Sequence, residues 1–219
     1  MFRQLPILFA LYFFITVLDL VFIYFNLTDL RWFTKPLLMP LLLIAVFTKR
    51  TEIKLYQLIV SALFFSWVGD VLLQMKGMFI PGLISFLLAH IFYIVYFIKI
   101  QQQKKGILQL QPLIGIPVLV YILIFLFLIY PFLDALKIPV TVYGITIGTM
   151  LLMAINTKRK LNDDASALFF NGALQFVISD SLLAVNLFAY NSVVLSLCVM
   201  LTYASAQWLI VRGSMKVAV

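Results

Sequence analysis

The chain has 219 residues, of which 64% are hydrophobic and 11% are charged, and its mean hydropathy is +1.12. A soluble globular domain is typically about half apolar and a quarter charged, so this composition excludes that class. The formal net charge of +8 does not indicate a nucleic-acid partner, because the basic residues lie in short segments between apolar runs. The single cysteine, Cys198, excludes a disulfide framework and a thiolate metal cluster.

Apolar runs recur along the whole chain, each near the ~20 residues that an α-helix needs to cross a hydrocarbon core of about 30 Å. Only helices and closed barrels satisfy their own backbone hydrogen bonds in lipid. The sequence therefore predicts one all-α integral membrane domain, residues 1–219, folded as a polytopic bundle of about eight transmembrane helices. The predicted spans lie near residues 5–26, 34–48, 55–75, 79–98, 112–130, 138–156, 165–187 and 192–211.

The second predicted span is short and contains Pro36 and Pro40, so we expect it to be kinked or tilted. With eight spans, twelve basic residues fall on one side of the membrane and four on the other. Positive charges favour the cytoplasm, so both termini are expected there, in the cytoplasmic membrane of a bacterium. The four on the opposite side are Arg31, Lys35, Lys76 and Lys137.

Two segments of the chain are similar to each other. Phe65–Leu73 resembles Val177–Leu183, and Tyr93 and Tyr203 each follow the aspartate of their segment by the same interval. One interpretation is a parallel 4+4 repeat, in which spans 3–4 correspond to spans 7–8. Chance matching in so apolar a sequence is the other interpretation.

Four ionisable side chains fall inside predicted spans: Asp19, Asp70, His90 and Asp180. A charged residue at the centre of a membrane helix costs roughly 2.5–3.5 kcal/mol on translocon scales, so such residues usually have a task or a partner. The three aspartates fall in the non-cytoplasmic half of their spans, and Lys35 lies near the same surface. These side chains are predicted to share a cavity that opens on that side.

Polar residues accompany the acids at helical spacing. Ser66 shares a face with Asp70, Ser179 adjoins Asp180, and Tyr203 and Gln207 share a face of the last span. They indicate a polar interior that contributes to a substrate site. The alternative is that they form interhelical hydrogen bonds, worth ~0.6 kcal/mol each, without a role in chemistry.

If Asp70 and Asp180 face each other, one carboxyl is expected to stay neutral beside an ionised neighbour. Such a pair can cleave an acid-labile ether through an oxocarbenium-like transition state, as in glycosidases. A metal held by Asp70, His90 and Asp180 is a less favoured alternative, because the chain lacks the usual zinc ligands. Membrane transport of protons or cations by the same aspartates is the main rival, and a catalytically silent lipid-binding protein is a third interpretation.

Five motifs in order resemble the YhhN-like family of eight-span membrane proteins, which includes the animal lysoplasmalogenases. They are Thr34-Lys35-Pro36-Leu37, Gly69-Asp70, Ser85-Phe86-Leu87-Leu88-Ala89-His90-Ile91-Phe92-Tyr93, Ser179-Asp180-Ser181-Leu182-Leu183-Ala184 and Tyr203-Ala204-Ser205-Ala206-Gln207-Trp208-Leu209-Ile210.

The resemblance implies hydrolysis of the vinyl-ether bond of a lysoplasmalogen in the bilayer, without metal or other cofactor, by the catalytic aspartates Asp70 and Asp180. It also implies that Lys35 binds the lipid phosphate, with interfacial snorkelling as the alternative, and that His90 and Tyr93 orient the headgroup or a carboxyl. Asp19 lies outside the motifs and is expected to pair with Lys35.

Overall fold

The structure of the protein is a computed structural model, in which residues 4–100 and 105–217 are described. Within these residues the secondary structure is entirely helical, and eight segments are long and apolar enough to cross a membrane. The elements are α1 (Gln4–Tyr24), α2 (Arg31–Thr48), α3 (Tyr56–Gln74), α4 (Phe79–Lys99), α5 (Ile107–Leu110), η1 (Pro112–Gly115), α6 (Ile116–Ile129), η2 (Tyr130–Phe132), η3 (Asp134–Leu136), α7 (Lys137–Asn156), α8 (Asp163–Ala184), η4 (Val185–Ala189) and α9 (Val193–Lys216).

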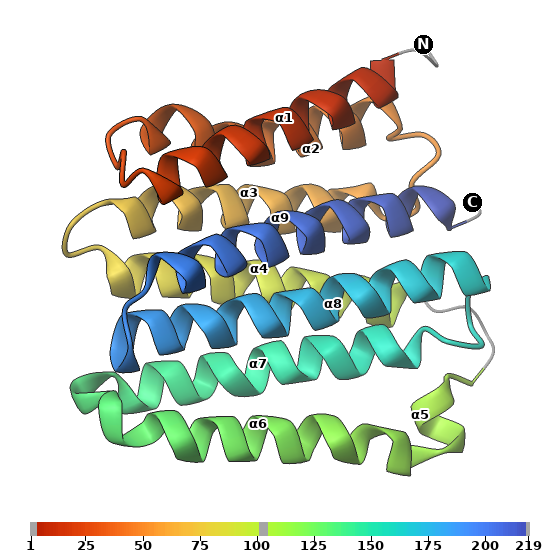
Figure 1. Cartoon of the computed structure of the whole chain (residues 1–219). Coiled ribbons are helices and arrows are strands. Elements are labelled where there is room, and N and C mark those ends of the chain that lie inside the picture. The colour runs from red at the N-terminus through yellow and green to blue at the C-terminus, as the bar shows by residue number, and fades with distance from the viewer. Residues whose placement is uncertain (1–3, 101–104, 218–219) are drawn as a thin grey trace.

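The long helices run up and down, so that both marked ends of the chain lie at one end of the bundle (Figure 1). We call this the terminal end. The connections between α1 and α2, α3 and α4, α6 and α7, and α8 and α9 lie at the other end, which we call the distal end (Figure 1). The prediction of an eight-span helical membrane protein is confirmed. The cytoplasmic placement of the termini and the internal repeat stay predictions.

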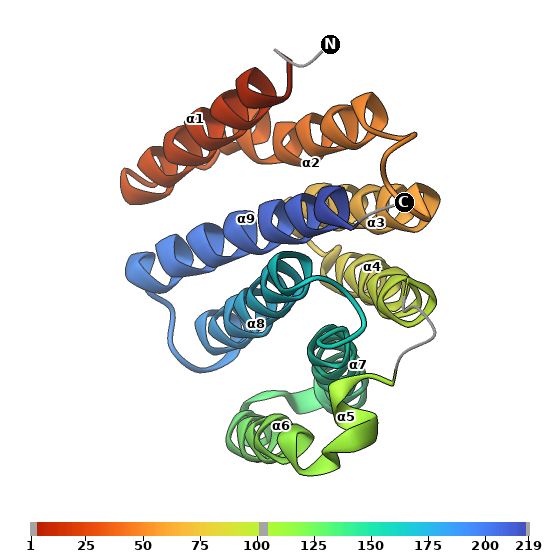
Figure 2. The ribbon, with the colours of Figure 1, turned by 90° about the vertical axis from the view of Figure 1, so that its right-hand side faces the viewer.

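Neighbouring helices in the chain pack against each other, as α1 does on α2 and α3 on α4. Helix α9 occupies a central position, because it packs on α8 and also contacts α1, α2 and α3 (Figure 2). Helix α6 lies at the edge and packs mainly on α7. Its side chains are largely exposed, including Phe127 at 78%, as expected for a helix that faces lipid tails.

Helix α2 begins at Arg31, three residues before the predicted span, and continues through both prolines. Pro40 has no N–H, so the carbonyl of Pro36 lacks the helical donor that it would otherwise have. The indole Nε1 of Trp67 on α3 donates to that carbonyl oxygen at 2.9 Å. The bond fixes α2 against α3 one residue from Lys35.

Helices α3 and α4 approach closely at Gly69. A Cβ atom at this position would lie 2.6 Å from the ring of Phe86, so the glycine permits the contact. The next residue is Asp70, whose position therefore depends on this packing. Helix α8 ends in a π-helical turn, η4, which the sequence did not predict. Such turns occur frequently at functional sites.

Candidate functional site

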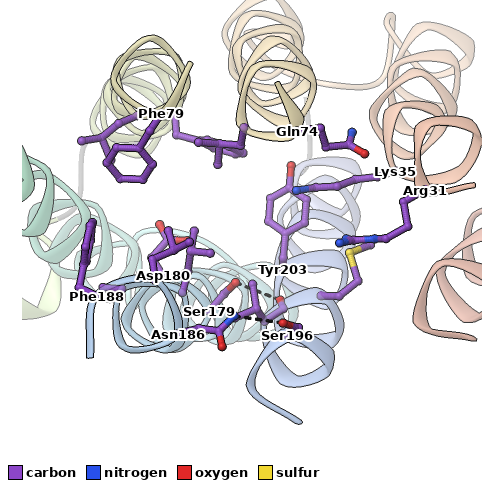
Figure 3. Close-up of a pocket in the computed structure, with 18 of the residues that line it drawn as sticks. Arg31, Lys35, Gln74, Phe79, Ser179, Asp180, Asn186, Phe188, Ser196 and Tyr203 are labelled. Carbon is purple, nitrogen blue, oxygen red and sulfur yellow. Dashed lines mark hydrogen bonds between the residues drawn. The ribbon is translucent and has the colours of Figure 1, made fainter. Parts of the chain in front are cut away.

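A cavity of about 570 Å³ opens at the distal end of the bundle. Its size falls in the range of ligand pockets, roughly 300–1,000 Å³. Residues from the α1–α2 connection and from α2, α3, α4, α7, α8, η4 and α9 line it, so segments from nearly the whole chain meet there. Among the residues predicted for a site, Lys35, Ser179, Asp180 and Tyr203 lie in its wall (Figure 3).

Asp70 is fully buried immediately behind that wall. The Nζ atom of Lys35 lies 3.4 Å from its Oδ1 atom, and the hydroxyl of Tyr203 donates a hydrogen bond of 2.6 Å to Oδ2. Both partners line the cavity. A buried carboxylate is tolerated only when it is paired and hydrogen-bonded, and these two contacts supply both conditions.

Asp180 lines the cavity directly, with its side chain 14% exposed. The hydroxyl of Tyr143 on α7 donates a hydrogen bond to its Oδ2 atom. The buried His90 places Nε2 at 3.9 Å from the same oxygen, beyond hydrogen-bond distance. Lys35 and Tyr203, the two partners of Asp70, line the same cavity as Asp180, so the two aspartates belong to one site.

A buried polar network lies behind Tyr203. Tyr93 donates to Oε1 of Gln207 at 2.6 Å, and Nε2 of Gln207 donates to Ser66 at 2.9 Å and approaches the hydroxyl of Tyr203 at 3.5 Å. Ser66, Tyr93 and Gln207 are fully buried. They therefore support Tyr203 and, through it, Asp70 from behind the cavity wall.

The expected pairing of Asp19 with Lys35 is wrong. Asp19 instead accepts hydrogen bonds from Nε and Nη2 of Arg31, at 3.3 and 3.1 Å, and from the hydroxyl of Thr34 at 2.5 Å. Lys35 pairs with Asp70 because it lies on a part of α2 that faces α3, whereas Arg31 reaches α1. Asp19 contacts the cavity only through Arg31, which lines it.

The remaining predicted residue, Ser179, donates from its hydroxyl to the carbonyl oxygen of Val199 at 3.1 Å and joins α8 to α9. Tyr143 and Arg31 are site residues that the sequence did not single out. In the described part of the chain, no three His, Cys, Asp or Glu side chains gather as a metal would require. Asp70, His90 and Asp180 thus do not form a ligand set there.

Polar and apolar side chains occupy different parts of the cavity. Figure 3 shows Arg31, Lys35 and Gln74 on one side, Phe79 and Phe188 on the other, and Asp180 and Tyr203 between them. The rings of Phe79 and Phe188 meet edge to face with centroids 5.6 Å apart. The cavity is therefore amphiphilic, with the carboxyl group of Asp180 between the polar and apolar parts.

Comparison with known proteins agrees with the family resemblance. Lysoplasmalogenase TMEM86B from Homo sapiens is 32% identical over 161 residues, which cover 73% of this chain and 64% of that protein. Its counterpart from Mus musculus is 31% identical over 160 residues, with the same two coverages. That from Rattus norvegicus is 29% identical, covering 62% of its length. The chain thus spans less than two thirds of the length of these relatives.

No solved structure matches the chain. The YhhN family matches residues 30–214, a segment that includes Lys35, Asp70, His90 and Asp180 and begins after Asp19. This match covers most of the eight helices and the entire cavity wall except for two residues of the α1–α2 connection. The chain belongs to the YhhN family.

Proposed function

We propose that this protein is an intramembrane lysoplasmalogenase, which hydrolyses the vinyl-ether bond of a lysoplasmalogen to a fatty aldehyde and glycerophosphoethanolamine or glycerophosphocholine. The observation that carries the proposal is one amphiphilic cavity, lined by Asp180 and by Lys35 and Tyr203, the two partners of Asp70. Relatives that cover 73% of the chain are lysoplasmalogenases, which supports the same reaction here.

The shape of the cavity suits a single-chain amphiphile. The headgroup would lie beside the basic residues of α2, and the alkenyl chain would lie against Phe79, Phe188 and the apolar residues Leu183 and Leu187. In this orientation the vinyl-ether bond, which joins headgroup to chain, comes to the boundary where the aspartates lie. Binding thus brings the reacting bond to the carboxyl groups.

The surroundings of the two acids suggest different roles. Lys35 neutralises Asp70, so Asp70 suits the role of a standing carboxylate. Asp180 lies nearer the apolar part of the cavity, and among the described residues no lysine or arginine forms an ion pair with it, so it suits the role of the proton donor. One carboxyl would act as the general acid and the other as the general base, as in glycosidases.

Asp180 transfers its proton to the β-carbon of the vinyl ether, and the electron pair of the double bond forms the new C–H bond, which leaves an oxocarbenium ion. Asp70 stabilises this cation and accepts a proton from the water that attacks its carbon. The hemiacetal then breaks its C–O bond to the glycerol oxygen, which takes the proton from Asp70. The hemiacetal hydroxyl gives its proton to Asp180 as the aldehyde forms, so both carboxyls return to their starting states.

A packed aromatic layer on the terminal side of the cavity favours hydrolysis over a channel. Beneath the aspartates, the fully buried rings of Tyr93, Phe97, Phe169 and Phe176 pack against each other between α4, α8 and α9. An ion that reached Asp70 or Asp180 from the distal end would meet this packed aromatic layer. A channel would instead need a hydrated path that continues to the terminal end.

Turnover by the purified protein in detergent tests the proposal. Given a lysoplasmalogen, the wild type should release aldehyde in the presence of a chelator as well as in its absence. Asp70→Asn and Asp180→Asn should each abolish release, because amides can neither donate the proton nor accept one. Asp164→Asn, at the exposed pair with Lys216, is the isosteric control and should keep full activity. Unchanged rates in both cavity variants would contradict the mechanism.

A further inference from the structure

Arg31 lines the cavity, and its guanidinium is held by Asp19 through only some of its N–H donors. Its guanidinium carries five N–H donors, of which two bond to Asp19, so three remain. The side chain is 24% exposed, and it points into the cavity beside Lys35 (Figure 3). Arg31 can therefore bind a second anion without giving up the first.

The contacts of Asp19 keep the guanidinium in this orientation. Asp19 is fully buried and also accepts a hydrogen bond from Thr34, one turn after Arg31 on α2. A buried pair of this kind is weak evidence for stability, because desolvation of both charges offsets their attraction. Its geometric effect is definite, since two parallel bonds fix the plane of an arginine.

Lys35 is less suited to bind the anionic part of a ligand. Its ammonium already faces Asp70 at 3.4 Å, and moving it to a phosphate would leave that buried carboxylate without its cation. Arg31 lies one helical turn nearer the start of α2 and so closer to the mouth at the distal end. The two basic residues are therefore suited to different groups of one ligand.

We propose that Arg31 binds the phosphate of the lysolipid headgroup, with Asp19 and Thr34 as positioning residues. Lys35 remains the ion-pair partner of Asp70. This inference rests on the proposed function for the identity of the lipid. It assigns the selectivity for phospholipids over neutral ether lipids to Arg31, because a guanidinium matches phosphate oxygens with two parallel hydrogen bonds.

Binding of lipids that cannot be hydrolysed tests this inference separately from turnover. A 1-O-alkyl glycerophosphocholine and a 1-O-alkyl glycerol with the same saturated chain share the ether but differ in the phosphate. Radiolabelled forms of both would be measured on the purified full-length protein in detergent. Arg31→Gln should weaken binding of the phospholipid about tenfold or more and leave binding of the alkyl glycerol unchanged.

Further variants distinguish phosphate recognition from a loss of structure. Arg31→Lys should fold and recover only part of the lost affinity, because lysine keeps the charge and lacks the planar fork. Asp19→Asn should weaken phospholipid binding less than Arg31→Gln does. Lys137→Gln is the matched control, since Lys137 lies at the same end over the ring of Tyr130. Equal weakening of both lipids by Arg31→Gln and by Arg31→Lys, or no weakening of either, would overturn the proposal.

Competition identifies the source of the phosphate. Glycerophosphocholine should displace the alkyl phospholipid from the wild type at lower concentrations than inorganic phosphate does. Equal displacement by the two would assign the site to free phosphate and overturn the headgroup assignment. If phosphate-dependent binding requires Arg31 while no lysoplasmalogen is cleaved, this inference stands and the proposed hydrolase function fails.

Discussion

The hydroxyl of Tyr203 on α9 donates a hydrogen bond to Asp70 on α3, across 133 positions of the sequence. The same hydroxyl is approached from behind by Gln207, which is tied to Ser66 and Tyr93. The carboxyl group of Asp70 is therefore held by residues of three helices. This contact predicts that Tyr203 maintains the catalytic geometry.

Tyr203→Phe should lower the turnover number about tenfold to a hundredfold, because a hydrogen bond to a charged group contributes about 1.5–3 kcal/mol. The fold should persist, since the ring still fills its space. Tyr96→Phe is the control: within the described residues its buried hydroxyl has no hydrogen-bond partner, so its removal should leave turnover unchanged. Equal effects of the two variants in an aldehyde-release assay would argue against the role of Tyr203.

Lys35→Met should destabilise the protein by about 3–5 kcal/mol, because it leaves the buried carboxylate of Asp70 without its cation. Asp70→Asn in the same chain removes that uncompensated charge, so the double variant should recover most of the lost stability. Thermal unfolding in detergent measures both effects. If the two single changes simply add, the ion pair does not couple the residues.

Phe188→Ala should enlarge the apolar part of the cavity, because the ring of Phe188 lines it in contact with the ring of Phe79. Turnover should shift toward substrates with longer alkenyl chains, as measured by kcat/KM over a series of chain lengths. Phe127→Ala, on the lipid-facing surface of α6, should leave the preference unchanged. An unchanged preference in Phe188→Ala would mean that the alkenyl chain of the substrate binds elsewhere.

The orientation in the membrane is testable by cysteine labelling. In a Cys198→Ser background, a cysteine replacing Lys76 at the distal end should react with an impermeant maleimide in intact cells. A cysteine replacing Lys158 at the terminal end should react only after the membrane is opened. These results are expected because most basic residues lie at the terminal end, which the charge bias assigns to the cytoplasm. The reverse pattern would invert the proposed topology.

The sequence predicts the helical bundle well, because hydrophobicity and length alone decide whether a segment crosses a membrane. It also singles out the acids Asp19, Asp70 and Asp180, since an acid inside an apolar span is rare. It does not determine how each helix is rotated about its axis. Arg31 and Lys35 lie one turn apart on α2, so only the packing of α1 and α3 decides which of them meets Asp19.

Tyr143 was missed for a related reason. It is one of ten tyrosines in an aromatic-rich sequence, and nothing in its neighbourhood distinguishes it from a residue at a lipid interface. Its hydrogen bond to Asp180 depends on α7 packing beside α8. The π-helical turn at the end of α8 was likewise not predicted from the sequence.

Proline inside a helix usually weakens it, because a backbone hydrogen bond is lost. In α2 the carbonyl that Pro40 leaves free instead joins this helix to α3. Because Pro40 cannot occupy the carbonyl of Pro36, that oxygen is free to anchor the indole of Trp67. A residue with an N–H at position 40 would compete with the indole for the oxygen. Pro40 thus permits a contact between α2 and α3 that holds Lys35 within ion-pair distance of Asp70.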